Sequence, residues 1–527
     1  MPHRSIKFSR QNTLFFTFSS ITPNYQTMKS PFLKLSCIAL LPLFFIGCTP
    51  TPTTPQPEAT PQVEVSEPAP TPEPAPQPEP APQPEPAPQP EPAPQPEPAP
   101  QPEPAPTPPP APAPAVQTTT AEEAAVIARV QELQGTVRRN PAGRILGLVI
   151  ESNELTLDDM QLISRLSNIE TIRLFGPAVN DDYVEALRGL TTLHTVDIEN
   201  SSISDRALEM LAELPNIHTL RLRRNLNFTD RAITLFAEFP NLRALHILYN
   251  GFSPMALFDL GDLTAIRVLD IRGMPVSDST LMFVGDIESL EDIFISSNTV
   301  TNNGIAELKR CANLRLISLQ DADVSVGLAD ILKEMENLRS LRLFRCPKFG
   351  AEAIAELGAL TQLETLELRG LGCSPEALRA LKSLVNLRSV EFSELSNLDS
   401  ATIIEVIREF PRLDTIRLFG IPADDTVAAF LATIPALRDV RLQAIAITDR
   451  GLESLTALPN LQTLDIHANR VHLTPEGAMV LTRFQDLRRL IIPETIDSPA
   501  LRTAMLVNSP RIAITVNTYE HATAAQQ

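Results

Sequence analysis

The stretch Leu338-Arg339-Ser340-Leu341-Arg342-Leu343 carries the pattern that decides the fold. Its apolar residues are spaced L-x-x-L-x-L, and this triplet returns every 24 to 26 residues from Ile145 to a degenerate copy at Ile512. A fixed period in this range predicts a solenoid of stacked units, because no single unit can bury its apolar face alone. Function is then expected on a long shared surface rather than in a central pocket.

Within each unit the triplet predicts a short strand, and the following twelve or so residues predict a helix. The segment 204–214 begins with a capping serine and an early aspartate, and its apolar residues then follow helical spacing. Four further starts place a hydroxyl residue before a proline, which suits the first helical position because its missing N–H costs nothing there. These are Ser253-Pro254, Ser374-Pro375, Thr474-Pro475 and Ser498-Pro499.

The segment Thr448-Asp449-Arg450-Gly451-Leu452-Glu453-Ser454-Leu455-Thr456-Ala457-Leu458-Pro459-Asn460-Leu461 resembles the repeat unit of the leucine-rich repeat superfamily. The form is the strand-plus-helix type found in ribonuclease inhibitor and in bacterial proteins, and the resemblance covers about 370 residues. It implies an α/β leucine-rich repeat solenoid, or horseshoe, with a parallel inner sheet and outer helices. About 15 repeats of 24–26 residues are expected over residues 141–518.

One feature of the family is only partly present. The family usually has Asn or Cys three residues after the triplet, where the side chain bonds backbone groups of the neighbouring turn. Here Asn225, Asn250, Asn298, Cys346 and Asn469 keep it, whereas Pro177, Met274, Leu371, Leu395 and Ile421 do not. We therefore expect an interrupted polar ladder.

Residues 1–47 are interpreted as a leader and a secretory signal, with Met28 as a candidate true start. A basic segment precedes an apolar run of twelve residues, 35–46, which is too short to span a bilayer. The ending Phe45-Ile46-Gly47-Cys48 resembles the lipobox of bacterial lipoproteins, which implies lipid attachment at Cys48. The alternative is a cysteine that merely lies near an ordinary cleavage site.

Residues 48–120 are rich in proline, glutamate and glutamine, and contain nine glutamates and no basic residue. Such a segment buries too little apolar surface to fold, so it predicts a disordered, extended linker. A spacer is favoured over a docking site for aromatic-lined grooves. Residues 121–140 are expected to form an N-terminal capping helix, with Ala124, Ile127, Val130 and Leu133 at near-helical spacing, and residues 519–527 a polar tail.

The charge and the cysteines restrict the possible partners. The chain carries a formal charge of −19, and the part after the linker has 39 basic against 54 acidic residues. This balance argues against nucleic acid as a partner and against adhesion to anionic lipid. Three cysteines remain beyond Cys48, namely Cys311, Cys346 and Cys373, and they are expected as buried thiols. A Cys346–Cys373 disulfide is the alternative.

The sequence presents no catalytic constellation and no cofactor or metal motif. His194 and His218 occupy the same place in consecutive repeats and are expected to stack side by side. The chain is therefore predicted not to be an enzyme, with no cofactor and no metal.

The surface expected to bind is the concave face, where residues between and just after the triplet project from the sheet. Three places put Arg and Phe there together, a pairing enriched at protein interfaces. The tentative binding residues are Arg173, Phe175, Arg221, Arg223, Tyr249, Arg342, Phe344, Arg417 and Phe419. Charges in neighbouring strands, such as Glu199 beside Arg223, are equally expected to pair with one another.

The favoured function is a non-catalytic protein- or peptide-binding lipoprotein of the bacterial cell envelope, exported and held to a membrane only through its lipid anchor. The outer membrane or cell surface is favoured over the inner membrane. One alternative is a structural envelope protein whose stalk spans a wall layer. A second is an effector or ubiquitin-ligase adaptor, for which no further module is visible in the sequence.

Overall fold

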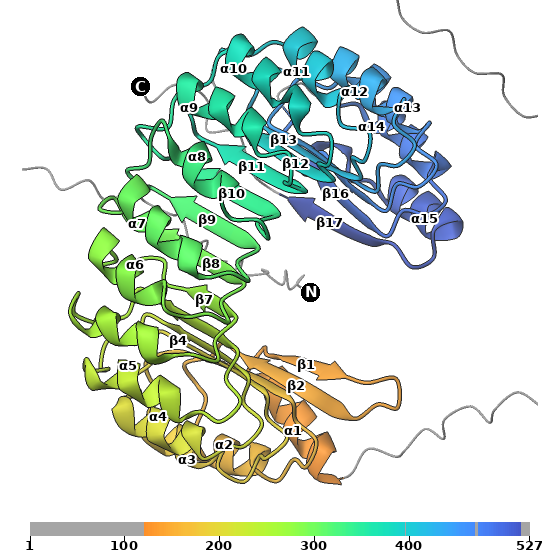
Figure 1. Cartoon of the computed structure of the whole chain (residues 1–527). Helices are drawn as coiled ribbons and strands as arrows, with labels where there is room; N and C mark the ends of the chain where they lie inside the picture. The colour runs from red at the N-terminus through yellow and green to blue at the C-terminus, as the bar shows by residue number, and fades with distance from the viewer. Residues whose placement is uncertain (1–120, 396, 470–472, 518–527) are drawn as a thin grey trace, which may run out of the picture. The chain divides into compact units, whose positions relative to one another are not determined.

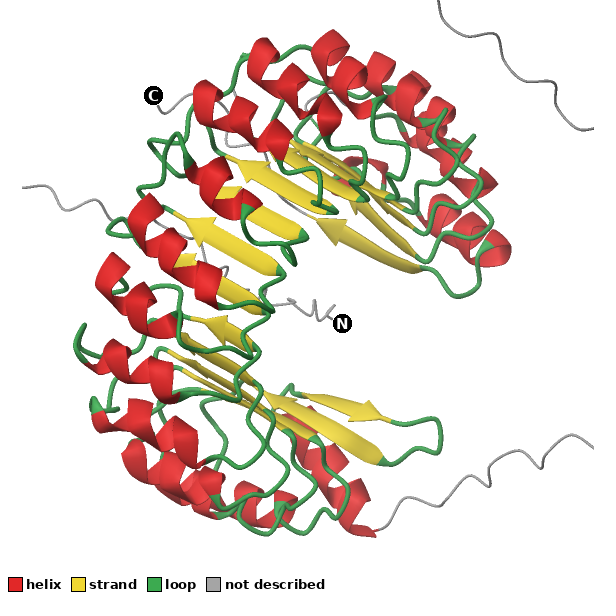
Figure 2. Cartoon of the chain, in the orientation of Figure 1, coloured by secondary structure: helices red, strands yellow, loops and turns green. Residues whose placement is uncertain are grey.

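The computed structural model describes residues 121–395, 397–469 and 473–517. The predicted signal segment, Cys48, the linker and the tail 519–527 lie outside the described residues. In the described part, strands form one inner layer and helices cover its outer side (Figures 1 and 2). The strands pair in chain order, all in parallel except β1, which runs antiparallel to β2. The predicted α/β leucine-rich repeat solenoid is confirmed.

The strands are β1 (Thr136–Arg139), β2 (Ile145–Ile150), β3 (Thr171–Phe175), β4 (Thr195–Glu199), β5 (Thr219–Arg223), β6 (Ala244–Leu248), β7 (Val268–Asp270), β8 (Asp292–Ser296), β9 (Leu316–Gln320), β10 (Ser340–Phe344), β11 (Thr365–Arg369), β12 (Ser389–Ser393), β13 (Thr415–Phe419), β14 (Asp439–Gln443), β15 (Thr463–Asp465), β16 (Arg489–Pro493) and β17 (Ala513–Asn517). The α-helices are α1 (Ala121–Glu132), α2 (Leu157–Ile163), α3 (Asp181–Glu185), α4 (Asp205–Ala212), α5 (Arg231–Leu235), α6 (Asp278–Val284), α7 (Asn302–Glu307), α8 (Leu328–Lys333), α9 (Ala351–Glu356), α10 (Pro375–Ala380), α11 (Ser400–Ile407), α12 (Asp425–Leu431), α13 (Asp449–Leu455), α14 (Pro475–Ala478) and α15 (Pro499–Asn508). The 3₁₀ helices are η1 (Phe236–Glu238), η2 (Ala256–Asp262), η3 (Leu308–Arg310), η4 (Leu357–Ala359), η5 (Leu381–Ser383), η6 (Met479–Arg483) and η7 (Glu494–Ile496).

The apolar triplet forms the core, as its spacing predicts. In the repeat quoted first, Leu338, Leu341 and Leu343 are at most 1 % exposed. The side chains of Arg342 and Phe344 alternate with them and face the other side of the strand. Most repeat helices are shorter than the predicted twelve residues, because the chain must return to the next strand within one period. None of the helices in the described part is both long and apolar enough to cross a membrane.

Two of the predicted helices need correction. Ser253-Pro254 does not start an α-helix: the 3₁₀ helix η2 follows it, and the Ser253 hydroxyl accepts a hydrogen bond from the backbone N–H of Ala256 at 3.3 Å. The predicted cap over 121–140 is helical only to Glu132, and strand β1 follows. Its buried residues include Val126, Val130 and Leu133, while Ala124 is exposed.

A hydrogen-bonded relay joins the starts of successive helices. The carboxylate of Asp181 accepts hydrogen bonds from the backbone N–H and the hydroxyl of Ser204 in the next repeat, at 2.8 and 2.6 Å. Asp205–Thr229, Asp230–Ser253, Asp278–Thr301, Asp425–Thr448 and Asp449–Thr474 repeat this arrangement. A Cβ at Gly451 would lie 2.5 Å from Asp425 Oδ1. The Thr-Asp-x-Gly-Leu motif is thus explained by contact between repeats.

The polar ladder after the triplet is interrupted, as predicted, but Asn298 does not belong to it. Asn225 accepts a hydrogen bond from the backbone N–H of Ser201 and donates one to Ile198, and Cys346 Sγ takes the same place 3.8 Å from the Leu319 carbonyl. Asn298 instead lies exposed in a turn. A second ladder, which the sequence analysis missed, uses the asparagine just before the triplet. Its side chain donates to a backbone carbonyl of the preceding repeat at Asn216, Asn241, Asn313, Asn337, Asn386 and Asn460.

Candidate binding surface

The parallel register brings the side chains of the inner face into two rows. The middle row contains Arg173, Asp197, Arg221, His246, Asp270, Phe294, Ser318, Arg342, Glu367, Glu391, Arg417, Arg441 and Asp465. The end row, at the ends of the strands, contains Phe175, Glu199, Arg223, Leu248, Arg272, Ser296, Gln320, Phe344, Arg369, Ser393, Phe419, Gln443 and His467. Eight of the nine tentative binding residues therefore share one face, and Tyr249 follows the end of β6.

Near the N-terminal end of the sheet, most charges in these rows pair with one another, whereas Arg221 is exposed and has no carboxylate within 4.0 Å among the described residues. Arg173 lies 3.0 Å from Glu151 and 3.2 Å from Glu199, and Glu199 also lies 3.4 Å from Arg223. Burial raises the pKa of Asp197, although the charges of Arg173 and Arg221 oppose the shift. Arg173 and Arg223 are thus already neutralised within the chain.

The arginines of two other Arg-Phe pairs, Arg342 with Phe344 and Arg417 with Phe419, are neutralised in the same way. Arg342 lies 3.4 Å from Glu367, and Arg417 lies 3.8 Å from Glu367 and 3.7 Å from Glu391. Burial raises the pKa of Glu367, and Glu391 adds to the shift while both arginines oppose it. The pairing expected as the alternative to binding is present at both motifs.

Two of the predicted phenylalanines have a different guanidinium against their rings. Phe344 lies 4.7 Å from the guanidinium of Arg369 and 4.3 Å from that of Arg345, and the same Arg369 lies 5.5 Å from Phe419. Both rings are half-buried. We call Phe344, Arg369 and Phe419 the aromatic row. Arg369 was missed as a site residue, although it occupies the equivalent position in the repeat directly after Phe344.

The pair of Arg173 and Phe175 differs, since Phe175 lies beside Glu199 in the sheet register rather than beside an arginine. A small hollow of about 140 Å³ lies next to the aromatic row. It is lined by Glu391, Ser393, Arg417, Leu418, Phe419, Arg441 and Gln443.

Tyr249 occupies a left-handed turn after β6, with φ of 54°, and is 42 % exposed. Its ring lies 5.9 Å from the guanidinium of Arg223 and 5.6 Å from that of Arg224. A Cβ at Gly273 would lie 2.2 Å from the ring, so only glycine leaves room for it. Arg224 follows the end of β5, a position that the sequence analysis did not consider.

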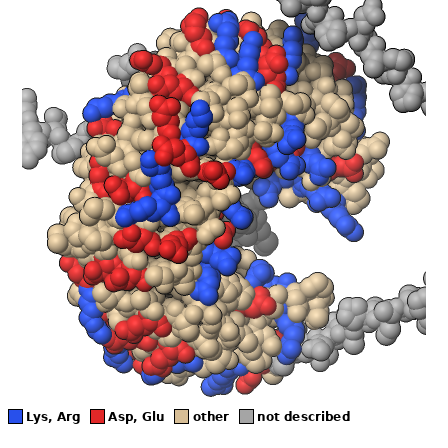
Figure 3. All heavy atoms as spheres, viewed as in Figure 1, with Lys and Arg blue, Asp and Glu red and all other residues tan. Residues whose placement is uncertain are grey.

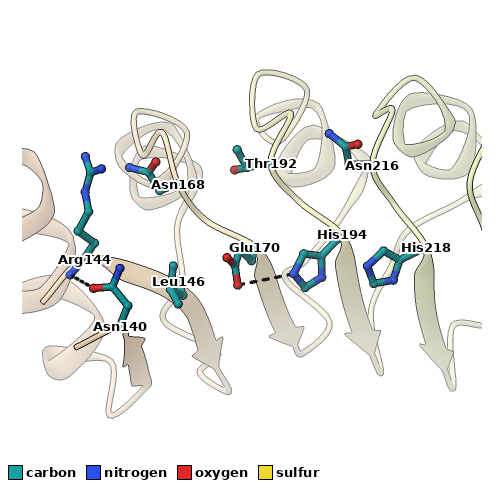
Figure 4. A pocket seen from close by; sticks show the side chains of 9 residues that line it. All are labelled: Asn140, Arg144, Leu146, Asn168, Glu170, Thr192, His194, Asn216 and His218. Atoms are coloured by element: carbon teal, nitrogen blue, oxygen red, sulfur yellow. Dashed lines mark hydrogen bonds and ion pairs between the residues drawn. The ribbon is translucent and has the colours of Figure 1, made fainter. Parts of the chain in front are cut away.

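A shallow hollow of about 540 Å³ lies where strands β2 to β5 begin (Figure 4). His194 and His218 stack there with ring centroids 4.7 Å apart, which confirms the predicted neighbours, and Glu170 lies 3.6 Å from His194. Burial and the nearby His194 lower the pKa of His218. In residues 121–517, as far as they are described, no cluster of three His, Cys, Asp or Glu side chains is arranged to hold a metal ion.

Cys311, Cys346 and Cys373 are free and buried, so the alternative Cys346–Cys373 disulfide is wrong. Burial raises the pKa of each thiol to about 11. The neutral thiol therefore predominates at neutral pH, and these cysteines serve as small apolar residues.

Comparison with known proteins identifies the repeat. A family model described as "Leucine-rich repeat region" matches residues 233–507, which is just over half of the chain. The structure of an internalin from Listeria monocytogenes is similar, with 13 % identity and a TM-score of 0.35, covering 76 % of this chain and 95 % of the internalin chain. A leucine-rich repeat protein from Leptospira interrogans shows 15 % identity and a TM-score of 0.29, covering 67 % of this chain and 91 % of its own. The chain belongs to the leucine-rich repeat proteins, which typically act as non-catalytic scaffolds that bind other proteins.

Proposed function

We propose that this chain is a non-catalytic protein- or peptide-binding lipoprotein of the bacterial cell envelope, and that it binds its partner through the concave face around β10–β13. The observation that carries the proposal is the aromatic row. Two half-buried phenylalanine rings, Phe344 and Phe419, are held on a mostly polar face with the guanidinium of Arg369 against both.

The physical support comes from the cost of binding. Phenylalanine loses little conformational freedom when it binds, and the contacts with Arg369 restrict Phe344 and Phe419 before a partner arrives. Binding energy at protein interfaces concentrates in a few large apolar or arginine side chains at the centre of a contact. Because Glu367 and Glu391 are already paired with arginines, a partner need not neutralise them.

A pull-down tests the binding surface. The full chain is crosslinked in intact cells and captured, and the triple variant Phe175→Ser, Phe344→Ser, Phe419→Ser is compared with wild type. If one ring is a hot spot, affinity for the captured partner should fall by about 2 kcal/mol. The matched control replaces three exposed apolar residues away from this face, Val326, Val385 and Val507, with serine and should leave capture unchanged.

Three outcomes would revise the proposal. An intact fold with undiminished capture would move the site away from the inner sheet. A marked fall in melting temperature would show that the rings act as packed core. Repeated failure to crosslink any partner would favour the alternative of a structural envelope protein.

The anchor and the location rest on sequence alone, on the apolar run that ends in Gly47-Cys48. We expect Cys48→Ser to release the chain from the membrane fraction while the repeats stay folded. The measurement is sedimentation with membranes, together with labelling by a fatty-acid probe. A variant that still labels and still sediments would contradict the lipid anchor but leave the binding surface untouched.

A further inference from the structure

The residues that immediately precede the strands form a third row, which we call the edge row. It contains Glu170, His194, His218, Arg243, Arg267, Glu291, Arg315, Arg339, Glu364, Arg388, Asp414, Arg438, Gln462 and Arg488. The backbone N–H of each residue from His194 onward donates to the carbonyl of the preceding member, at distances from 2.6 to 3.1 Å. The row is therefore a continuous ladder whose side chains are neighbours in space.

Arginine outnumbers the acids in this row by seven to four, and each acid already has a basic partner. Glu291 lies 3.3 Å from Arg267, Glu364 lies 4.0 Å from Arg339, and Asp414 lies 3.0 Å from Arg388. Glu170 pairs with His194 and with Arg138, which lies outside the row. Arg243, Arg315, Arg438 and Arg488 have no carboxylate within 4.0 Å among the described residues, although the Arg243 guanidinium donates a hydrogen bond to the Leu242 carbonyl at 2.8 Å.

The positive excess of the edge row is opposite in sign to the net charge of the chain. Arg315, Arg438 and Arg488 are exposed in a molecule whose part after the linker has 39 basic against 54 acidic residues. Figure 3 shows Lys and Arg atoms at the inner edge of the described unit, with Asp and Glu atoms among them. An exposed arginine without an ion pair stays solvated and contributes little to the free energy of folding. Stability of the fold therefore does not explain why this row contains so many arginines.

We propose that the edge row binds an acidic segment of a partner polypeptide, whose carboxylates pair with the guanidinium groups left free. The planar guanidinium matches a carboxylate with two parallel hydrogen bonds. Arg243 and Arg315 lie three strands apart, or about 14 Å at the usual strand spacing. About four residues of extended peptide cover that distance, so glutamates or aspartates of one short segment reach both.

The net charge of the chain selects this class of partner over long polyanions. A short acidic peptide in contact with the row senses mainly the arginines within a screening length of about 8 Å at physiological salt. A nucleic acid extends beyond the row and meets the acidic remainder of the molecule, which repels it. The partner is therefore a polypeptide with spaced carboxylates rather than a phosphate backbone.

The test uses the full chain and a fluorescein-labelled peptide of alternating Glu and Gly, with the Gln-Gly peptide as its neutral counterpart. Anisotropy is measured at low and at physiological salt. We expect binding of the Glu-Gly peptide only, weakened by salt. The triple variant Arg243→Gln, Arg315→Gln, Arg438→Gln should bind about tenfold more weakly, at a few-fold per exposed pair.

Two matched variants sharpen the result. Replacing Arg206, Arg231 and Arg450 with glutamine removes the same charge from the helix-bearing side and should leave the affinity within about twofold of wild type. Glu291→Gln should increase the affinity about twofold, because it frees Arg267 for the peptide.

Equal loss in the edge-row and helix-side variants would overturn the proposal, since it would show only an effect of net charge. Equal binding of the Gln-Gly peptide would overturn it as well, and so would displacement of the peptide by a single-stranded oligonucleotide at lower concentration. The triple phenylalanine variant should retain peptide binding, so this test and that of the aromatic row fail independently.

Discussion

The middle row of the concave face and the edge row are both rich in arginine and belong to the same repeats, yet their arginines differ in whether they pair with carboxylates. In the middle row, Arg173, Arg342 and Arg417 each lie within 4.0 Å of a carboxylate from a neighbouring strand, namely Asp197, Glu367 and Glu391. In the edge row four arginines have no such partner among the described residues. The difference follows from burial: the Glu367 side chain that pairs with Arg342 is 19 % exposed, whereas the unpaired Arg315, Arg438 and Arg488 of the edge row are exposed. A charge that loses water must be paired, but one that keeps water need not be.

The comparison of the two rows depends on the alternation of buried and inner-face side chains along each strand. A charge introduced on the buried side of a strand tests this alternation most strongly. Leu341 lies between Ser340 and Arg342 in the sequence and is fully buried. Leu341→Asp should lower the free energy of unfolding by several kcal/mol, because an unpaired charge would be buried in the core. Limited proteolysis should then cut flanking repeats.

Glu334→Lys is the control for that experiment. Glu334 is 63 % exposed and loses only a surface pair with Lys309. It should remain as resistant as wild type. Equal proteolysis of the two variants would contradict the assignment of Leu341 to the buried side of its strand.

A buried carboxylate of the middle row gives the next largest effect. Asp270 is 3 % exposed, and Arg272 and His246 hydrogen-bond to it. Burial alone would raise its pKa, but these bonds outweigh burial and the pKa lies below its ordinary value. Asp270→Asn should therefore cost about 2 kcal/mol at neutral pH.

The pH dependence of that loss follows from the lowered pKa. The ionised Asp270 stabilises the fold fully above its unfolded pKa of about 3.9, and this contribution disappears as the pH falls through the lower folded value. The difference between wild type and Asp270→Asn in urea unfolding should thus be largest at neutral pH and shrink below about pH 4. A difference that grows on acidification would contradict the pairing.

Removing the guanidinium from the aromatic row should have a smaller effect. Arg369→Gln loses the contacts with Phe344 and Phe419 and an exposed ion pair with Glu394 at 3.4 Å, and should lower the free energy of unfolding by about 1 kcal/mol. Arg408→Gln on the helix-bearing side removes one similar contact, 5.6 Å from Phe430, and is the matched control. If thermal unfolding shows a greater loss for the control, the rings of the aromatic row are not held by Arg369.

The edge row should contribute least to stability. Arg438→Gln removes a solvated charge with no ion pair among the described residues, and the free energy of unfolding should change by less than about 0.5 kcal/mol. A loss above about 1 kcal/mol would show that Arg438 has a structural role, and the contrast between the two rows would disappear at that position.

Much of the fold could be predicted because apolar spacing is a local signal. The triplet around Leu341 defines strand, register and buried face at once. Departures occur at positions that the apolar spacing does not distinguish from the regular ones. Ser253-Pro254 looks like the other proline starts, yet a 3₁₀ helix follows. Asn298 occupies the ladder position but lies in a turn that faces solvent.

The candidate site was predictable in position, and so was pairing between some charges of neighbouring strands, such as Glu199 and Arg223, but not the partner that each remaining arginine takes. The period placed Arg342 and Phe344 on one face from the sequence alone. It did not reveal that Arg342 forms an ion pair with Glu367, or that the guanidinium of Arg369 lies over the ring of Phe344. Those choices depend on side-chain reach across neighbouring strands, which spacing along one strand does not specify.

The sequence by itself determined the solenoid, the parallel inner sheet and the identity of the residues that face inward, since a repeating apolar period leaves one way to bury every unit. Only the tertiary structure decided which charges are neutralised and which remain free. Pairing requires two side chains from different repeats to meet where they are partly buried. The spacing of the apolar residues specifies neither the burial of a charged side chain nor how far it extends toward the next repeat.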